Sequence, residues 1–488
     1  MKKEYLILAA IFIVIFHFRL MFILQTPTFS SDSAYYNIRQ TQYITENKFK
    51  PMIFDDKSYN GRFILDSHLF HYFLATLNTV LPETFVFKII PELLFSTLVL
   101  VVYVLAKKIS ESTTAALFAS FLSGFVPITV LESLNNVSIY SLLFPLMFLQ
   151  VYFLFNLKEN KNKFIILSFI LPILSPISFL LSVAIIIYLI LLNLESKKVK
   201  KSTGEALLFY LLISLLISLI IYKKAFVSSG LFAVWQNLPK GLLAEYFKSV
   251  NILELIYNIG FIPVIFGITG LFIGIMHKKS RETYFLSSII IACLILLALK
   301  LISFQTGVVI LGILLTIVSA IAIEKFITYI NITKFSKHKY LIFFFAVIIV
   351  TLTLVIPAYY SGKTVIKNAL TNNEVTALTW IKKNTEQDST ILANIDEGHY
   401  ITAIANRKNV ADTKYLLAPD KYSEVKEMFK TESLVKALQL MKKNNVDYVY
   451  MSKRSKGREG ITGLKYYDKQ CLKTVYENED AQIYKVLC

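Results

Sequence analysis

The hydrophobic positions of the chain are gathered into long runs separated by polar connections. A helix needs about 20 predominantly apolar residues to cross the hydrocarbon core of a bilayer. The runs stand at 4–25, 84–106, 113–131, 138–156, 163–176, 178–194, 205–222, 257–276, 283–300, 305–324 and 339–358. The pattern therefore predicts a polytopic α-helical membrane protein with about eleven transmembrane helices.

From about residue 360 the long apolar runs stop and shorter segments alternate. A helix-like stretch, SLVKALQLMKKNN, precedes a strand-like one, VDYVYMSKR. Short strands alternating with amphipathic helices indicate an α/β domain. We therefore expect a transmembrane domain over residues 1–358 and a small α/β domain over 359–488. The first contains two long connections, at 26–82 and 223–256.

Basic residues set the predicted orientation. The chain holds 51 Lys and Arg against 33 Asp and Glu, a net charge of +18. Short cytoplasmic connections collect Lys and Arg, whereas long translocated ones escape this bias. With the N-terminus in the cytoplasm, the tight outer turns near 132–137 and 175–178 hold none. Eleven spans then place the C-terminal domain outside a multi-pass cell-membrane protein. No basic stripe interleaved with aromatics marks a soluble segment, so we expect no nucleic-acid partner.

Three cysteines rule out a disulfide framework. Cys293 lies in an apolar run. Cys471 and Cys488 could pair only if the C-terminal domain lies in an oxidising compartment.

The first long outer connection is the part of the chain richest in ionisable groups. Asp32 follows the first apolar run, with Tyr36 and Arg39 at helical spacing behind it. Ser-Ser-Asp-Ser before a helical run is an N-cap signal. A carboxylate at the membrane surface also suits a divalent cation or a general base. Arg62, after an Asn-Gly turn, suits either a loop carboxylate or a phosphate. Both pairs of readings stay open.

Two segments of this connection resemble a known family. FRLMFILQTPTFSSDSAYYNIRQTQYI resembles the first helix and loop of catalytic subunits of archaeal and eukaryotic oligosaccharyltransferases, which are GT-C membrane glycosyltransferases. That family has an Arg, an Asp, a Tyr-rich stretch and a second Arg, here Arg19, Asp32, Tyr35, Tyr36 and Arg39. DDKSYNGRFILDSHLFHYFLA is similar to a loop signature of related GT-C proteins.

The C-terminal domain adds a third similarity and the clearest departures. ALTWIKKNTEQDSTILANIDEGHYITAIANRKNVADTKY is similar to the segment carrying the family's W-W-D-Y-G motif, but Asn394-Ile395-Asp396-Glu397-Gly398 stands in its place. The second acidic motif aligns with Asn136-Val137-Ser138, so both of its acids are missing. Glu245 fits the family's S/T-x-x-E position. Lys300 stands near the place of a late-helix Arg.

The resemblance implies an enzyme that moves a sugar or oligosaccharide from a polyprenyl (dolichyl) phosphate or diphosphate donor. The acceptor would be a protein, lipid or glycan on the extracytoplasmic side. The partners it implies are the lipid-linked sugar, an acceptor polypeptide or glycan, and membrane lipid. Few Gly and Pro, with many Lys, Ile and Asn, fit an archaeal cell membrane.

The resemblance also suggests roles for individual residues. Asp32 and Glu245 would be catalytic, and the donor phosphate would meet Arg62, Lys300 and Arg39. The acceptor side would hold Asp396, Arg407 and Tyr36. A divalent metal, Mn²⁺ or Mg²⁺, would bind Asp32, Glu245 and Asn136. The missing second acidic motif shifts weight towards a metal-independent relative that uses a polyprenyl monophosphate.

Two rival functions remain open. The missing acids and Trp pair fit a non-catalytic GT-C descendant, either a scaffold or a binder of lipid-linked sugars. A lipid or solute transporter would place ionisable groups near the bilayer midplane, often in two repeated halves. The sequence shows no repeat.

Overall fold

The computed structural model of the chain describes residues 3–59, 61–235, 252–414 and 421–488. The chain forms two compact units, each described here by itself. The helical unit comprises Met1–Thr26, Glu83–Ile221 and Tyr246–Lys367. The mixed unit comprises Pro27–Pro82, Tyr222–Glu245 and Asn368–Cys488.

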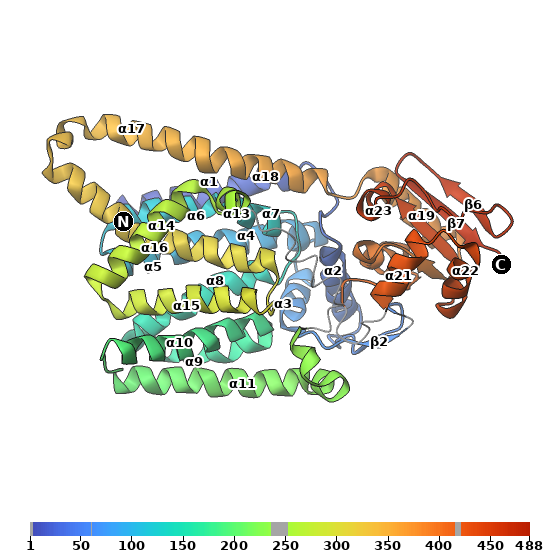
Figure 1. The fold of residues 1–488 in the computed structure, drawn as a ribbon, viewed down its shortest axis with the longest axis horizontal. Helices are drawn as coiled ribbons and strands as arrows, with labels where there is room; N and C mark the ends of the chain where they lie inside the picture. The colour runs from blue at the N-terminus through green and yellow to red at the C-terminus, as the bar shows by residue number, and fades with distance from the viewer. Residues whose placement is uncertain (1–2, 60, 236–251, 415–420) are drawn as a thin grey trace. The chain divides into compact units, whose positions relative to one another are not determined.

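The helical unit is a bundle of long apolar helices (Figure 1). Its helices are α1 (Lys3–Ile23), η1 (Phe85–Ile89), α4 (Ile90–Ser96), α5 (Leu98–Ser110), α6 (Thr113–Gly124), α7 (Pro127–Ser133), α8 (Tyr140–Phe155), α9 (Leu157–Leu174), η2 (Pro176–Ser178), α10 (Phe179–Leu194), α11 (Lys201–Ser229), α13 (Ile252–Ile259), α14 (Phe261–Ile273), η4 (Gly274–Lys278), α15 (Arg281–Ala298), α16 (Phe304–Ile332), η5 (Lys334–His338), α17 (Lys339–Val350), η6 (Thr351–Val355) and α18 (Ile356–Lys367).

All eleven predicted runs fall in helices, but fewer qualify as spans. Among the described residues, eight helices are long and apolar enough to cross a membrane, or nine if the bent pair α6–α7 is one span. The bend of 47° falls at Pro127, the first residue of α7. A proline there lacks the N–H that would continue the preceding helix. Helix α8 is shorter, and α9 begins with the charged stretch LKENKNK.

Helix α16 forms the core of the helical unit. Every residue from Thr306 to Ile323 is buried. Helix α11, by contrast, exposes much of its apolar surface, including Leu212, Leu216 and Ile220. In a bilayer such a surface faces lipid, so its exposure agrees with a membrane-embedded bundle.

One buried polar network joins helices within this unit. The Arg19 guanidinium donates to the Glu92 carboxylate at 2.6 Å and to the Ser133 hydroxyl at 2.9 Å. Glu92 also accepts from the backbone N–H of Asn135, and Lys88 donates to the Asn135 side-chain oxygen at 2.6 Å. Such polar contacts hold helices together where water is absent.

The mixed unit is built on a five-stranded sheet in the order β4-β3-β5-β7-β6. Strand β3 pairs in parallel with β4 and β5, and β7 pairs antiparallel with β5 and β6. The strands are β3 (Thr390–Leu392), β4 (Lys408–Asn409), β5 (Tyr448–Ser452), β6 (Leu472–Glu477) and β7 (Ala481–Val486). The helices around them are α19 (Asn372–Asn384), η7 (Ile395–Glu397), α20 (Gly398–Tyr400), η8 (Ile401–Ala405), α21 (Lys421–Lys430), α22 (Leu434–Lys443) and α23 (Lys453–Glu459). The predicted helix SLVKALQLMKKNN contains α22, and the predicted strand VDYVYMSKR contains β5.

The first long connection packs on this sheet domain. Its elements are α2 (Asp32–Glu46), β1 (Phe54–Asp55), β2 (Arg62–Phe63) and α3 (Leu69–Asn78), and η3 (Gly230–Trp235) comes from the second connection. Tyr59 of the first connection is buried in one apolar core with Leu392, Phe429 and Val449. Residues 27–82 and the C-terminal domain are therefore parts of one folded unit.

Candidate active site

Asp32 does not cap the helix that it begins. Ser31 is the N-cap residue of α2 and makes no side-chain cap bond. The Asp32 Oδ1 atom instead accepts the backbone N–H groups of His399 at 3.0 Å and Tyr400 at 3.2 Å. These N–H groups lie at the start of the turn α20–η8, where amides have no helical partner. The prediction that Asp32 caps the following helix is therefore wrong, because its carboxylate binds a helical turn of the C-terminal domain instead.

The other oxygen of Asp32 faces a histidine. Asp32 Oδ2 lies 3.9 Å from His399 Nε2, and neither atom has a hydrogen-bond partner among the described residues. His399 is only 1% exposed and Asp32 only 7%. Burial, with the nearby Asp412 carboxylate, raises the pKa of Asp32 well above its ordinary value. Burial lowers the pKa of His399 to about 4, so its imidazole is neutral at pH 7.

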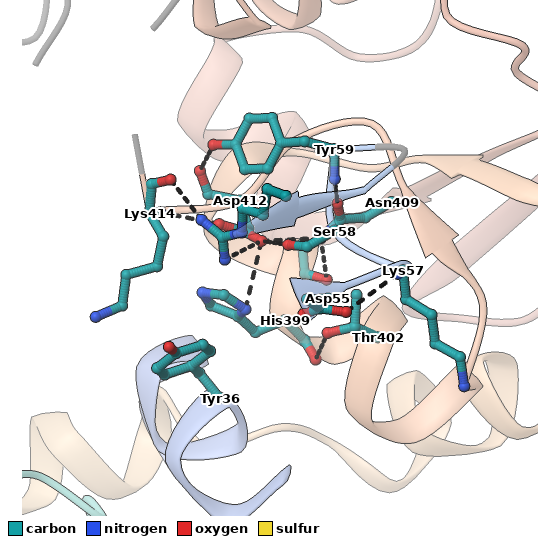
Figure 2. Close-up of polar contacts among 12 residues, drawn as sticks. Tyr36, Asp55, Lys57, Ser58, Tyr59, His399, Thr402, Asn409, Asp412 and Lys414 are labelled. Carbon is teal, nitrogen blue, oxygen red and sulfur yellow. Dashed lines mark hydrogen bonds and ion pairs between the residues drawn. The ribbon is translucent and has the colours of Figure 1, made fainter. Parts of the chain in front are cut away.

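Asp412 holds the first connection against the C-terminal domain. Its carboxylate accepts from the Ser58 hydroxyl, from Arg62 Nη2 at 3.2 Å and from the backbone N–H of Lys414 at 2.9 Å. It also lies 3.7 Å from His399 Nδ1, as Figure 2 shows. Burial alone would raise the pKa of Asp412, but the adjacent Arg62 cation outweighs it and lowers the pKa. Asp412 is therefore an ionised carboxylate beside a neutral imidazole.

Tyr36 covers the other side of the histidine. Its ring lies 5.0 Å from the His399 ring, and its hydroxyl donates to Asp66 at 3.0 Å. Lys414 pairs with the same Asp66 at 2.6 Å. Burial opposes ionisation of Asp66, but the Lys414 cation lowers its pKa below the ordinary value. His399 is thus held between an aromatic ring and an ionised carboxylate.

Both arginines predicted to bind the donor phosphate are already paired with carboxylates. Arg39 donates through two nitrogens to the two oxygens of Asp55, each at 2.7 Å. Arg62 pairs with Asp412 and donates to the Lys414 carbonyl at 2.5 Å. A bidentate Arg–carboxylate pair is among the stronger charge-assisted contacts in proteins. Arg62 thus pairs with a carboxylate of the C-terminal domain, not with one of its own loop, and its phosphate-binding role stays a prediction.

Two predicted acceptor-side residues have other partners. Asp396 pairs with Arg458. Arg407 donates to the Thr385 hydroxyl at 2.8 Å and to the carbonyls of Lys382 and Thr385 at the end of α19. Cations at a helix C-terminus satisfy its free carbonyls. These contacts give Arg407 a structural role, while Tyr36 joins the cluster around His399.

Three predicted residues remain. Glu245 is not among the described residues. Asn136 and Lys300 belong to the helical unit, where the Asn136 amide donates to the Glu132 carbonyl at 3.3 Å. Lys300 follows α15 in a left-handed backbone conformation, with φ 58°.

The predicted metal site, Asp32, Glu245 and Asn136, lies partly outside the described residues, because Glu245 is not among them. No group of three or more histidine, cysteine, aspartate or glutamate side chains stands in ligating geometry within the described ranges. Mg²⁺ and Mn²⁺ sites need several oxygen ligands around one ion. Asp32 offers one oxygen without a partner among the described residues, and the metal site stays a prediction.

Four residues of the cluster had no predicted role: His399, Asp412, Asp66 and Lys414. Asp412 kept its place in the resemblance to the family segment, and Asp66 stood in the polar connection. His399 followed the altered motif as an ordinary turn residue. Only the contact between residues 32 and 399 shows its position, and no local pattern encodes that contact.

Comparison with known proteins identifies the fold. No family model and no curated protein matches the chain. Among solved structures, the archaeal oligosaccharyltransferase AglB from Archaeoglobus fulgidus, in complex with an inhibitory peptide and a dolichol-phosphate, is similar with a TM-score of 0.72 and 14% identity. That similarity covers 92% of this chain and 69% of AglB. The Archaeoglobus fulgidus oligosaccharyltransferase in complex with Zn and sulfate gives a TM-score of 0.63 at 15% identity, covering 98% of this chain and 73% of that one.

A second kind of enzyme shares the fold over its whole length. ArnT from Cupriavidus metallidurans, bound to undecaprenyl phosphate, is similar with a TM-score of 0.55 and 10% identity. The similarity covers 99% of this chain and 98% of ArnT. The chain therefore has the GT-C fold of membrane glycosyltransferases, as predicted: a polytopic helical bundle with a small C-terminal sheet domain.

Proposed function

We propose that this protein is a membrane glycosyltransferase that uses a polyprenyl-linked sugar as donor. One observation carries the proposal: the GT-C fold extends over 92–99% of the chain and is shared with enzymes whose structures hold dolichol-phosphate or undecaprenyl phosphate. A fold admits several functions, so the site must supply the rest of the argument.

The proposed reaction places Asp32 as the general base. The bond between the sugar's anomeric carbon and the phosphate oxygen breaks, and the phosphate leaves with the electron pair. The acceptor atom bonds to the anomeric carbon and its proton passes to the Asp32 carboxylate. The raised pKa of Asp32 makes it a stronger proton acceptor than an ordinary carboxylate. Glu245 keeps its predicted role as a second acid.

The leaving phosphate needs a cation as its charge develops. Arg39 and Arg62 already neutralise Asp55 and Asp412. Arg39 therefore holds the first connection together, and Arg62 holds that connection on the C-terminal domain. Lys300 keeps its predicted role at the donor phosphate, and the missing second acidic motif favours a monophosphate donor.

The acceptor is proposed only by class: a protein, lipid or glycan. The sequence lacks the Trp pair with which oligosaccharyltransferases bind a sequon, so sequon recognition has no support here. We propose that Tyr36, beside His399, contacts the acceptor. Asp396 and Arg407 keep that role only as predictions from the resemblance.

The proposed side of the membrane is the extracytoplasmic one. Cys471 and Cys488 form a disulfide between β6 and the C-terminus, with Cα atoms 5.0 Å apart. Disulfides persist in oxidising compartments and are rare in the cytosol. The disulfide supports a C-terminal domain outside the cell and, with the basic inner connections, a cytoplasmic N-terminus.

A transfer assay in nanodiscs tests the proposal. The purified protein would be given radiolabelled sugars on polyprenyl monophosphate and diphosphate, with peptide, glycolipid and glycan acceptors, with and without Mn²⁺. We expect transfer from the monophosphate donors without added metal. Transfer only from diphosphate donors with metal would contradict the assigned donor. Donor binding without transfer to any acceptor would favour a lipid-linked-sugar binder, and neither binding nor transfer would refute the proposal.

A further inference from the structure

His399 is a buried polar side chain with an unsatisfied atom directed at Asp32. Nε2 of His399 and Oδ2 of Asp32 face each other at 3.9 Å, and both are unpartnered among the described residues. Most buried polar atoms are hydrogen-bonded, and an orphaned one lowers stability by roughly 1–3 kcal/mol. Two orphaned atoms facing each other therefore need a reason beyond packing.

The histidine is held by groups on three sides. Asp412 lies 3.7 Å from Nδ1 and Asp32 Oδ2 lies 3.9 Å from Nε2, so the imidazole stands between two carboxylates. Tyr36 packs against the ring at 5.0 Å. The backbone N–H of His399 itself bonds Asp32 Oδ1 at 3.0 Å. The ring consequently has one orientation, with Nδ1 on the side of Asp412 (Figure 2) and Nε2 on the side of Asp32 Oδ2.

The backbone around His399 is packed as tightly as its side chain. A Cβ atom on Gly398 would lie 2.2 Å from the Ala411 carbonyl oxygen and 2.6 Å from the Asp412 Cβ. Only glycine allows the turn to approach the 411–412 segment so closely. The turn that carries the two N–H donors and the imidazole is therefore fixed directly against Asp412.

We propose that His399, oriented by Asp412, is a positioning residue that fixes the free carboxylate oxygen of Asp32 for glycosyl transfer. The inference rests on the proposed function. One carboxylate oxygen is anchored by two amides, and the imidazole, with its proton on Nε2, faces the other oxygen as a donor and fixes where that oxygen points. The altered motif thus supplies a histidine beside the catalytic carboxylate. An orientation error of about 1 Å at a reacting group can slow a reaction about 100-fold.

The test compares His399→Phe with His71→Phe in the full-length protein in nanodiscs. Both histidines are buried in the mixed unit and both rings lie near Tyr36, but His71 pairs with Asn37 rather than facing Asp32. We expect His399→Phe to lower the transfer kcat at least tenfold, with donor-lipid affinity unchanged. His399→Gln, whose amide reaches towards the same oxygen, should recover part of the rate, and His71→Phe should stay within twofold of wild type. Wild-type kcat in His399→Phe would overturn the inference.

A second measurement keeps the inference separate from the proposed function. Melting temperatures of His399→Phe, Asp32→Asn and the double variant form a cycle that needs no turnover. We expect the shift of the double variant to differ from the summed single shifts by several degrees. The matching cycle with His71→Phe should be additive. Additive shifts in the His399 cycle would overturn the inference, whereas coupled shifts in an inactive wild type would overturn only the proposed function.

Discussion

The buried carboxyl groups of the mixed unit differ in how their surroundings shift their pKa values. Asp412 and Asp66 each have a cation beside them, and their pKa values lie below the ordinary range. Burial is the largest influence on Asp32 and Glu397, and it raises their pKa values. A carboxylate paired with a cation is suited to a structural role. A carboxyl group whose pKa is raised by burial is suited to taking up a proton.

Glu397 gives the sharpest prediction at the scale of one residue. It is buried, accepts from the Ser452 and Ser455 hydroxyls, and has a pKa raised by burial to about 7. The folded state then binds more protons than the unfolded state between about pH 4.5 and pH 7. The stability from this group is present below pH 4.5 and lost as the pH rises through 7. Glu397→Gln should remove that loss.

The measurement is the melting temperature of wild type and Glu397→Gln between pH 5 and pH 8. We expect the melting temperature of Glu397→Gln, relative to that of the wild type, to rise by several degrees from pH 5 to pH 8. His399 titrates in the opposite sense but is common to both proteins, so the difference curve isolates Glu397. Glu432→Gln, at an exposed carboxylate that pairs with Lys465, serves as control. Parallel curves of melting temperature against pH for wild type and Glu397→Gln would contradict the raised pKa of Glu397.

At the scale of elements, the turn α20–η8 is the piece that brings the site together. Its first N–H groups bind Asp32, and its first residue packs against the 411–412 segment. The turn is short, so its position depends on these contacts more than on its own helical hydrogen bonds.

Gly398→Ala should therefore destabilise the mixed unit and slow transfer together. The added methyl group meets backbone and Cβ atoms that cannot move independently, and such overpacking costs about 1–3 kcal/mol. Thermal unfolding of Gly398→Ala should show a fall of several degrees. Gly457→Ala is the matched control because a Cβ there meets nothing within 4 Å. Equal melting temperatures for the two variants would contradict the close approach.

The elements were largely predictable from the hydrophobic pattern, and the site was not. Every predicted apolar run lies in a helix, because burial in lipid dictates composition over each span. The number of spans was harder, since α9 combines an apolar end with charged residues and α6–α7 bends at Pro127. Asp32 was found because it carries a local signal and a resemblance. His399 was missed because its partner lies 367 positions away in the sequence.

At the scale of the whole molecule, the disulfide between Cys471 and Cys488 bears on both the stability and the proposed orientation of the C-terminal domain. Closing a loop between Cys471 and Cys488, 17 positions apart, stabilises a domain by about 3 kcal/mol in the chain-entropy model. Cys471→Ser should lower the melting temperature of the mixed unit, and a reductant should do the same for wild type but not for the variant. A reductant that shifts both equally would show that the bond is not formed.

The same cysteines report the orientation. In intact cells, brief reduction followed by a membrane-impermeant maleimide should label Cys471 and Cys488 but not the buried Cys293. Labelling that requires permeabilised cells would place the C-terminal domain in the cytoplasm and contradict the proposed orientation.

The central claim is that the chain transfers a sugar from a polyprenyl-linked donor with Asp32 as base. The most direct test is the single-turnover transfer rate of wild type and Asp32→Asn, with donor bound to both proteins in nanodiscs. Asparagine keeps the shape of the side chain and can still accept the amides of His399 and Tyr400, but it cannot take the proton. We expect the transfer rate of Asp32→Asn to be at least about 100-fold lower than that of the wild type, with donor binding intact. A factor of about 100 is the lower end of what general bases contribute. A variant that transfers sugar at close to the wild-type rate would contradict it.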